Sequence, residues 1–181
     1  GRLTDTLLKQ KREAEALSWA KLRWMSAPYE TDPIDRASRL LVKVWSAVDP
    51  ERQGLQGFAE AQKDSSKPNP LREVKLPPVD EKALQDRLAH LGSGAGAASE
   101  RIALHIWMGA WDKAMLEAQK LLENKDTATQ GALEAARTFK AHDLNLQRAN
   151  AFLTWLKTKE GPNPIDEFLK EQANTKTVEA K

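Results

Sequence analysis

Few residues in this chain could perform chemistry, and they do not form a recognisable set. His90, His105 and His142 are the only histidines, and cysteine is absent. A zinc site needs several His, Cys or carboxylate ligands at characteristic spacings, such as two histidines four residues apart on a helix. No two of these histidines have that spacing, and no carboxylate motif joins them. We therefore expect no metal site and no cofactor.

Two short motifs suggest catalysis or phosphate binding, but both lack the context that the chemistry requires. Ser18 and Lys21 match the Ser-x-x-Lys of penicillin-interacting enzymes, but the Ser-Asp-Asn and Lys-Thr-Gly elements are missing. Glycines at 92, 94 and 96 precede a predicted helix, whereas a dinucleotide fingerprint must follow a strand. A flexible connector explains these glycines better. We expect a protein that is not an enzyme.

The charge balance excludes several classes of partner. The chain has 28 basic and 26 acidic residues, interspersed along the predicted helices, which is typical of a solvated surface. This balance predicts no specific nucleic-acid binding. No run of about 18 apolar residues is present, so no membrane span is expected. Gly1 stands where an initiator methionine would be, so we expect a processed or truncated chain that lacks an N-terminal targeting segment, and the compartment stays open.

The hydrophobic pattern predicts an all-α protein. Apolar residues recur at helical spacing almost throughout, and no stretch shows sustained two-residue alternation. We expect one domain over residues 1–173, with a Pro-rich loop at 65–79 inside it and a polar, frayed tail at 174–181. About eight to nine helices are predicted, over residues 4–27, 33–48, 50–63, 81–91, 99–108, 111–124, 127–142, 144–159 and 164–173. Asp32–Pro33, Asp49–Pro50 and Asp80 are the predicted caps that open three of them.

The strongest local pattern is a helical hairpin around Gly109–Ala110. After this break, apolar residues fall on one helical face, and Ile102, Ala103 and Ile106 do the same before it. A basic residue followed by alanine also recurs in the second helix of each proposed pair, at Ala37, Ala83, Ala114 and Ala149. The intervals are 31 and 35 residues where the Pro-rich loop does not lengthen them, close to the length of about 34 residues of a two-helix unit in a helical solenoid. Small side chains at these positions would let crossing helices approach closely.

The segment Gly109-Ala-Trp-Asp-Lys-Ala114, with Gln119, Lys120 and Leu122 after it, resembles the turn and second helix of a tetratricopeptide repeat. Asp49–Pro50 resembles the closing Asp-Pro of that repeat. The resemblance implies a right-handed array of antiparallel helical hairpins, a TPR-like α-α solenoid. Three features depart from it: the long first helix, the loop that splits the second pair, and a fourth pair without the turn glycine.

The resemblance also implies a function. Solenoid repeats of this kind hold a peptide or a partner helix on a concave face, which the first helix of each pair lines. This predicts a non-enzymatic protein–protein interaction module with Arg101, His105 and Arg137 near the groove. Ordinary solvated surface is the alternative interpretation of the two arginines.

A second function stays open. The helix that ends in Trp45, then Leu76-Pro77-Pro78, then Gly109-Ala-Trp111 resemble helical domains of type VI secretion assembly proteins. This similarity implies a structural subunit that packs into a larger assembly through its helices and the Pro-rich loop. The sequence indicates neither the partner nor the oligomeric state.

Overall fold

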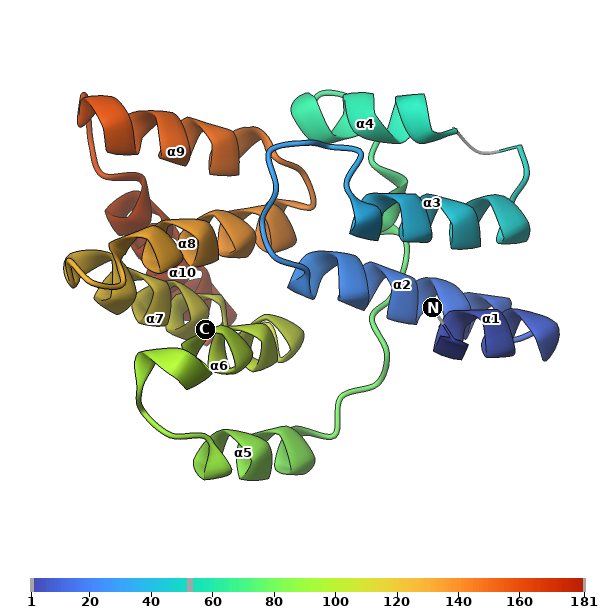
Figure 1. Ribbon diagram of the computed structural model, residues 1–181, viewed down its shortest axis with the longest axis horizontal. Helices are drawn as coiled ribbons and strands as arrows, with labels where there is room; N and C mark the ends of the chain where they lie inside the picture. Colours follow the sequence, from blue (N-terminus) through green and yellow to red (C-terminus); the bar gives the residue numbers. More distant parts are fainter. Residues whose placement is uncertain (1, 52–53, 181) are drawn as a thin grey trace.

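The computed structural model describes residues 2–51 and 54–180, and within these ranges the protein is built from helices alone (Figure 1). The prediction of an all-α fold is therefore confirmed, but the described residues form ten α-helices rather than eight or nine. The elements in chain order are α1 (Arg2–Lys9), α2 (Glu13–Ser26), α3 (Arg36–Val48), α4 (Leu55–Lys63), the 3-10 turn η1 (Pro70–Arg72), α5 (Glu81–His90), α6 (Ala95–Trp107), α7 (Trp111–Glu123), α8 (Ala128–Asp143), α9 (Gln147–Thr158) and α10 (Pro164–Glu179).

The first predicted helix, over residues 4–27, is in fact two helices. Lys11 has a φ of 58°. The backbone amides of Lys11 and Arg12 donate to the carbonyls of Leu8 and Leu7 at 3.0 and 2.9 Å. This pair of bonds is the Schellman arrangement that ends a helix. α1 then packs against α2 and buries Leu7. The prediction was wrong because the apolar spacing continues through the break and gives no sign of it.

α3, the helix predicted over residues 33–48, begins at Arg36 and not at Pro33. The carboxylate of Asp35 accepts a hydrogen bond from the backbone amide of Ser38 at 2.6 Å and caps α3. Asp32 instead accepts from the amide of Ile34 at 2.9 Å, inside the preceding turn. Both residues are good caps by type, so only the path of the chain decides between them.

The predicted opening of a helix at Asp49–Pro50 was also wrong. Asp49 is the residue that ends α3, and α4 begins at Leu55. Residues 52–53 of the predicted helix lie outside the described residues. The cap predicted at Asp80 is confirmed, because its carboxylate accepts from the amide of Ala83 at 3.0 Å.

The Pro-rich segment 65–79 forms no α-helix, as predicted, but it is not a free surface loop. Leu71 in η1 is completely buried. Lys21 donates from Nζ to the carbonyl oxygen of Val74 at 2.6 Å, and the Asn69 amide donates to the carbonyl of Leu144. The segment therefore packs between α2 and the turn that joins α8 to α9.

The hairpin predicted around Gly109–Ala110 is confirmed. α6 and α7 pack against each other across a short turn in which Gly109 has a φ of 68°, a conformation that favours glycine. Of the recurring alanines, Ala114 and Ala149 are fully buried, but Ala83 is exposed. The prediction of a helix crossing at Ala83 was wrong, since α5 lies to one side of the other helices and presents this face to solvent (Figure 1).

One cluster of buried apolar side chains extends from Leu7 of α1 to Phe168 of α10 and leaves out α5. Phe139 of α8 lies in its centre, with ring centroids of Phe152 and Phe168 at 5.5 and 5.3 Å. α10 runs on to Glu179, so the prediction that the last helix ends at residue 173 was wrong. Within the described ranges, none of the helices combines the length and apolar character needed to cross a bilayer.

Candidate interaction surface

Arg101, a predicted binding residue, makes extensive contacts inside the molecule. Its guanidinium group lies on Glu117 of α7, with Nη2 2.9 Å from Oε2. It also donates to the carbonyl oxygens of Gly92 and Gly94, so it fixes the glycine-rich connector to α6. Only 12% of its side chain is exposed, at the edge of a cavity of about 410 Å³. The structure thus gives Arg101 a role in holding α6, α7 and the connector together.

Arg137, the second predicted arginine, is buried between three helices. It pairs with Glu134 and donates to the carbonyl oxygens of Ser26 and Ser99 at 3.0 and 2.7 Å. One turn along α8, Lys140 donates from Nζ to the carbonyl of Trp24 at 2.9 Å. Two buried cations therefore occupy the C-terminal end of α2, where the helix dipole is negative.

His105, the third predicted residue, differs from Arg137 in that it is only half-buried. It lies on α6, and burial lowers the pKa of its imidazole, with Glu117 acting in the opposite direction. The three predicted residues are thus distributed over helix junctions, and the contacts described here do not bring them onto one open groove.

A polar cluster at the turn between α8 and α9 was not predicted. Nδ1 of His142 lies 2.7 Å from Oδ1 of Asp143, and Nε2 lies 3.3 Å from the amide of Gln172. Arg148 bonds to Asp143 at 2.8 Å and to Glu171 at 2.8 Å. Burial raises the pKa of Asp143, but the bonds from His142 and Arg148 outweigh it and hold that pKa below its ordinary value.

This cluster has the residue types of a catalytic His–Asp pair, but its polar atoms are already bonded within the protein. Both ring nitrogens of His142 have partners inside the protein, and both oxygens of Asp143 are bonded. A general base needs a free nitrogen within reach of a substrate proton. The arrangement therefore stabilises the α8–α9 turn. Among the described residues, no group of His, Cys, Asp or Glu could hold a metal ion.

A different cavity has the features of an open binding site. It holds about 500 Å³ between the C-terminal end of α2, the connector 27–35 and the first turns of α3. Its lining is partly apolar, from Ala27, Pro28, Ala37 and Leu40, and partly polar, from Ser26, Glu30 and Asp35. Arg23 and Arg36 also line it. We call this cavity the α2–α3 cleft.

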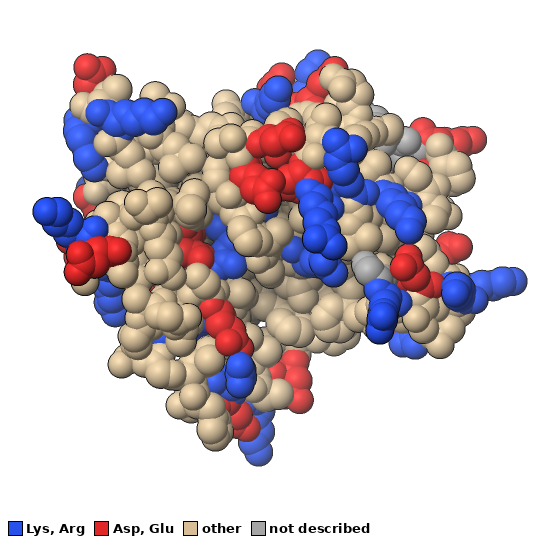
Figure 2. Space-filling view, viewed as in Figure 1, with Lys and Arg blue, Asp and Glu red and all other residues tan. Residues whose placement is uncertain are grey.

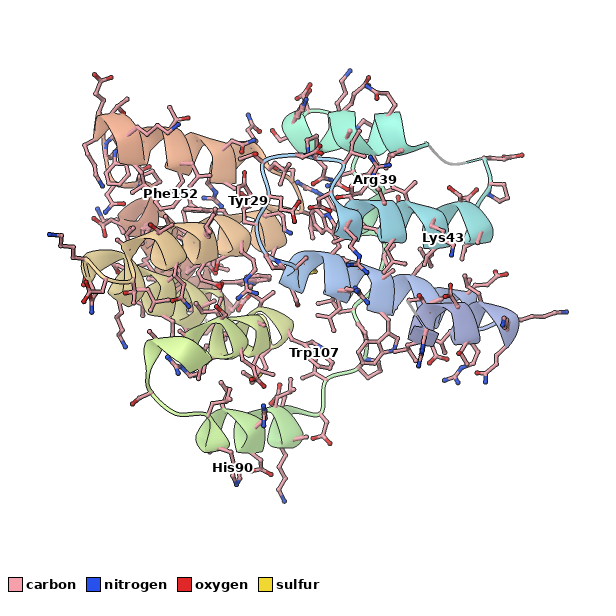
Figure 3. The ribbon with its side chains drawn as sticks, viewed as in Figure 1. Tyr29, Arg39, Lys43, His90, Trp107 and Phe152 are labelled. Atoms are coloured by element: carbon pink, nitrogen blue, oxygen red, sulfur yellow. The ribbon has the colours of Figure 1, made fainter. Side chains whose placement is uncertain are left out.

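Side chains from distant parts of the chain bond to the connector that lines the α2–α3 cleft. Lys140 also reaches the carbonyl oxygen of Ala27 at 3.4 Å, beneath the cleft. Burial lowers the pKa of Lys140 to about 8, with the nearby charge of Asp35 acting against this shift. The Tyr29 hydroxyl donates to the side chain of Asn150 on α9, which ties the connector to the other half of the molecule (Figure 3). A cleft held in this way is preformed, which reduces the entropic cost of binding.

Exposed basic side chains continue from the cleft along α3. Arg39 and Lys43 are exposed on this helix (Figure 3), and Figure 2 shows basic side chains over α2 and α3 with acidic side chains beside them. The sequence contained a signal for this surface, because positions 36, 39 and 43 recur at helical spacing opposite the buried face of α3. Arg36 is the basic residue before Ala37 in the recurring pairs, and none of the three was predicted as a binding residue.

Comparison of the chain with protein-family models, with curated proteins and with solved structures found no match in any of the three.

Proposed function

We propose that this protein is a non-enzymatic protein–protein interaction module whose partner binds in the α2–α3 cleft. The observation that carries the proposal is the contrast between this cleft and the polar clusters elsewhere. The cleft combines a partly apolar lining with exposed arginines, whereas the His142 cluster and Arg101 have their polar groups satisfied internally. Apolar pockets with a few charged groups at the rim are typical of partner binding.

The proposal includes a repeat-like arrangement of the helices, related to a TPR-like solenoid. The hairpin of α6 and α7, its turn at Gly109, and the burial of Ala114 and Ala149 support this arrangement. The role of Arg101, His105 and Arg137 in binding stays a prediction, and Arg137 is buried between α2, α6 and α8.

The test is a pull-down from native lysate followed by titration of the purified partner against variants. Arg36→Glu combined with Leu40→Asp alters the cleft at two side chains that are not part of the core. The matched control is Lys113→Glu with Leu116→Asp, an exposed pair on α7. We expect the cleft variant to lose the partner and the control to retain it, with helical circular dichroism unchanged in both.

Equal affinity of the partner for the wild-type protein and the cleft variant would overturn the assignment of the cleft. Loss of the partner in the control variant as well would show a nonspecific effect of added negative charge and would also contradict it.

A further inference from the structure

The basic side chains beside the α2–α3 cleft make few contacts within the described residues. Among the described residues, Arg23 and Arg36 make no ion pair or hydrogen bond, and Arg39 donates only to the carbonyl of Ile34, at 3.2 Å. Lys43 lies 3.7 Å from Asp5, with both side chains largely exposed, so this pair contributes little. Glu30 and Asp35 line the cleft together with Arg23 and Arg36, so the excess of exposed positive charge lies along α3, at Arg36, Arg39 and Lys43.

The spacing of these charges on α3 fits a particular shape of partner. Arg36, Arg39 and Lys43 lie on one face of the helix, and Leu40 lies between them. At 1.5 Å per residue, the span from Arg36 to Lys43 is about 10 Å, or two helical turns. A second helix lying along α3 would present side chains at the same repeat, which is how amphipathic helices dock into grooves.

The apolar lining of the cleft indicates what kind of side chain the partner would place there. Ala27, Pro28, Ala37 and Leu40 supply the apolar part of the lining of a cavity of about 500 Å³, and Ser26 and four charged residues supply the rest. A large apolar side chain of the partner would bury its surface there. Anchors of this kind, surrounded by charged residues at the rim, carry most of the affinity in protein–protein interfaces.

We infer that the occupant of the α2–α3 cleft is an acidic amphipathic helix of a partner protein. Its apolar stripe would enter the cleft, and carboxylates along one edge would pair with Arg36, Arg39 and Lys43. This inference rests on the proposed function and specifies the partner's chemistry.

A nucleic acid fits the same surface less well. Glu30 and Asp35 also line the cleft, and their carboxylates would repel a phosphate backbone that tracks across it. No aromatic side chain lines the cleft on which a base could stack. A peptide helix can place its carboxylates over α3 and its apolar residues beside Glu30, which a uniformly charged polymer cannot do.

The experiment measures fluorescence anisotropy of labelled peptides with the full chain. The probe is a helical peptide of about 18 residues, built from Glu, Ala and Leu, with Glu at i, i+3 and i+7 beside a leucine stripe. A second peptide carries Lys at each Glu position, and a single-stranded RNA is the third probe. We expect the acidic peptide to bind, and binding to weaken as salt is added.

The decisive variant is Arg36→Glu with Lys43→Glu, which reverses two charges seven residues apart. Its matched control is Lys113→Glu with Lys120→Glu, which has the same spacing on the exposed face of α7. We expect the first variant to lower the affinity for the acidic peptide by about tenfold or more and the control to leave it nearly unchanged. Circular dichroism establishes that each variant is folded.

Three outcomes would overturn the inference: no binding of the acidic peptide, equal binding of the lysine peptide, or tighter binding of the RNA that depends on the same residues. These results are distinct from failure of the proposed function. If the native partner still depends on Leu40 while the acidic peptide does not bind, the module binds in the cleft but its partner is not an acidic helix.

Discussion

The helices α6 to α9 and the C-terminal end of α2 are held in place by different kinds of contact. α7 and α8 approach so closely that a Cβ on Gly131 would lie 2.2 Å from the backbone nitrogen of Leu122. The end of α2 is instead held by single polar side chains from distant parts of the chain, such as Lys140 on the carbonyl of Trp24. The first kind of contact rests on small residues at regular spacing. The second rests on individual residues that no local pattern marks.

The largest expected effect tests the close packing of α7 on α8. Gly131→Val places side-chain atoms where the backbone of Leu121 and Leu122 lies, at 2.7 Å or less. Because backbone cannot rotate out of the way, we expect the free energy of unfolding to fall by about 3 kcal/mol or more. Chemical denaturation followed by circular dichroism measures this change.

The matched control is Gly96→Ala in α6, where an added Cβ meets no atom within 4 Å. Alanine is the better helix former, so we expect a gain of about 0.5 kcal/mol. A similar small gain from Gly131→Ala would show that the two helices are not in close contact.

The second prediction concerns the buried cation at the end of α2. The pKa of Lys140 is about 8, below the usual value for lysine of 10.5, so the unfolded chain holds its proton more tightly. Stability must then rise with pH between these two values, because the folded protein loses the proton first. From pH 7 to pH 10 we expect a gain of about 2 kcal/mol in the free energy of unfolding from this group.

Lys140→Met isolates this contribution. Lys21 has a pKa lowered by burial and contributes in the same direction, so the quantity to compare is the difference between wild-type and variant slopes. Denaturation at several pH values measures both. Parallel slopes for the two proteins would contradict the assignment of a buried, charged Lys140.

The smallest expected effect tests the hydrogen bond that joins the connector 27–35 to α9. Tyr29→Phe removes the hydroxyl that donates to Asn150 on α9, and we expect a loss of about 1 kcal/mol. Burial raises the pKa of Tyr29 to about 12, so the hydroxyl keeps its proton at neutral pH. Asn150→Ala completes a double-mutant cycle, and additive losses would show that the two side chains do not interact.

The elements that could be predicted are those whose local pattern and final packing agree. The hairpin at Gly109 and the cap at Asp80 are of this kind, because a turn glycine and an N-cap act on their own neighbours. The break at Lys11 and the start of α3 at Asp35 were missed. At Lys11 a lysine adopts a conformation usually left to glycine, and at Asp35 two equivalent caps compete.

In the candidate site, too, some features could be predicted from local sequence and others could not. Arg101 and Arg137 were predicted from their places in a repeat, but each lies among partners that come from other helices. The α2–α3 cleft was missed, although its basic residues are visible in the sequence, because its apolar lining combines the connector 27–35 with α3. Only the fold brings these segments side by side.

The sequence by itself determined that this protein is all-α and where most of its helices lie. Helical periodicity, capping and composition act over a few residues, so these features can be read locally. The tertiary structure decided which charges are buried and which stay free at the surface. Burial depends on the helices that cover a side chain, and for Lys140 and Arg137 those helices lie more than a hundred residues away along the chain.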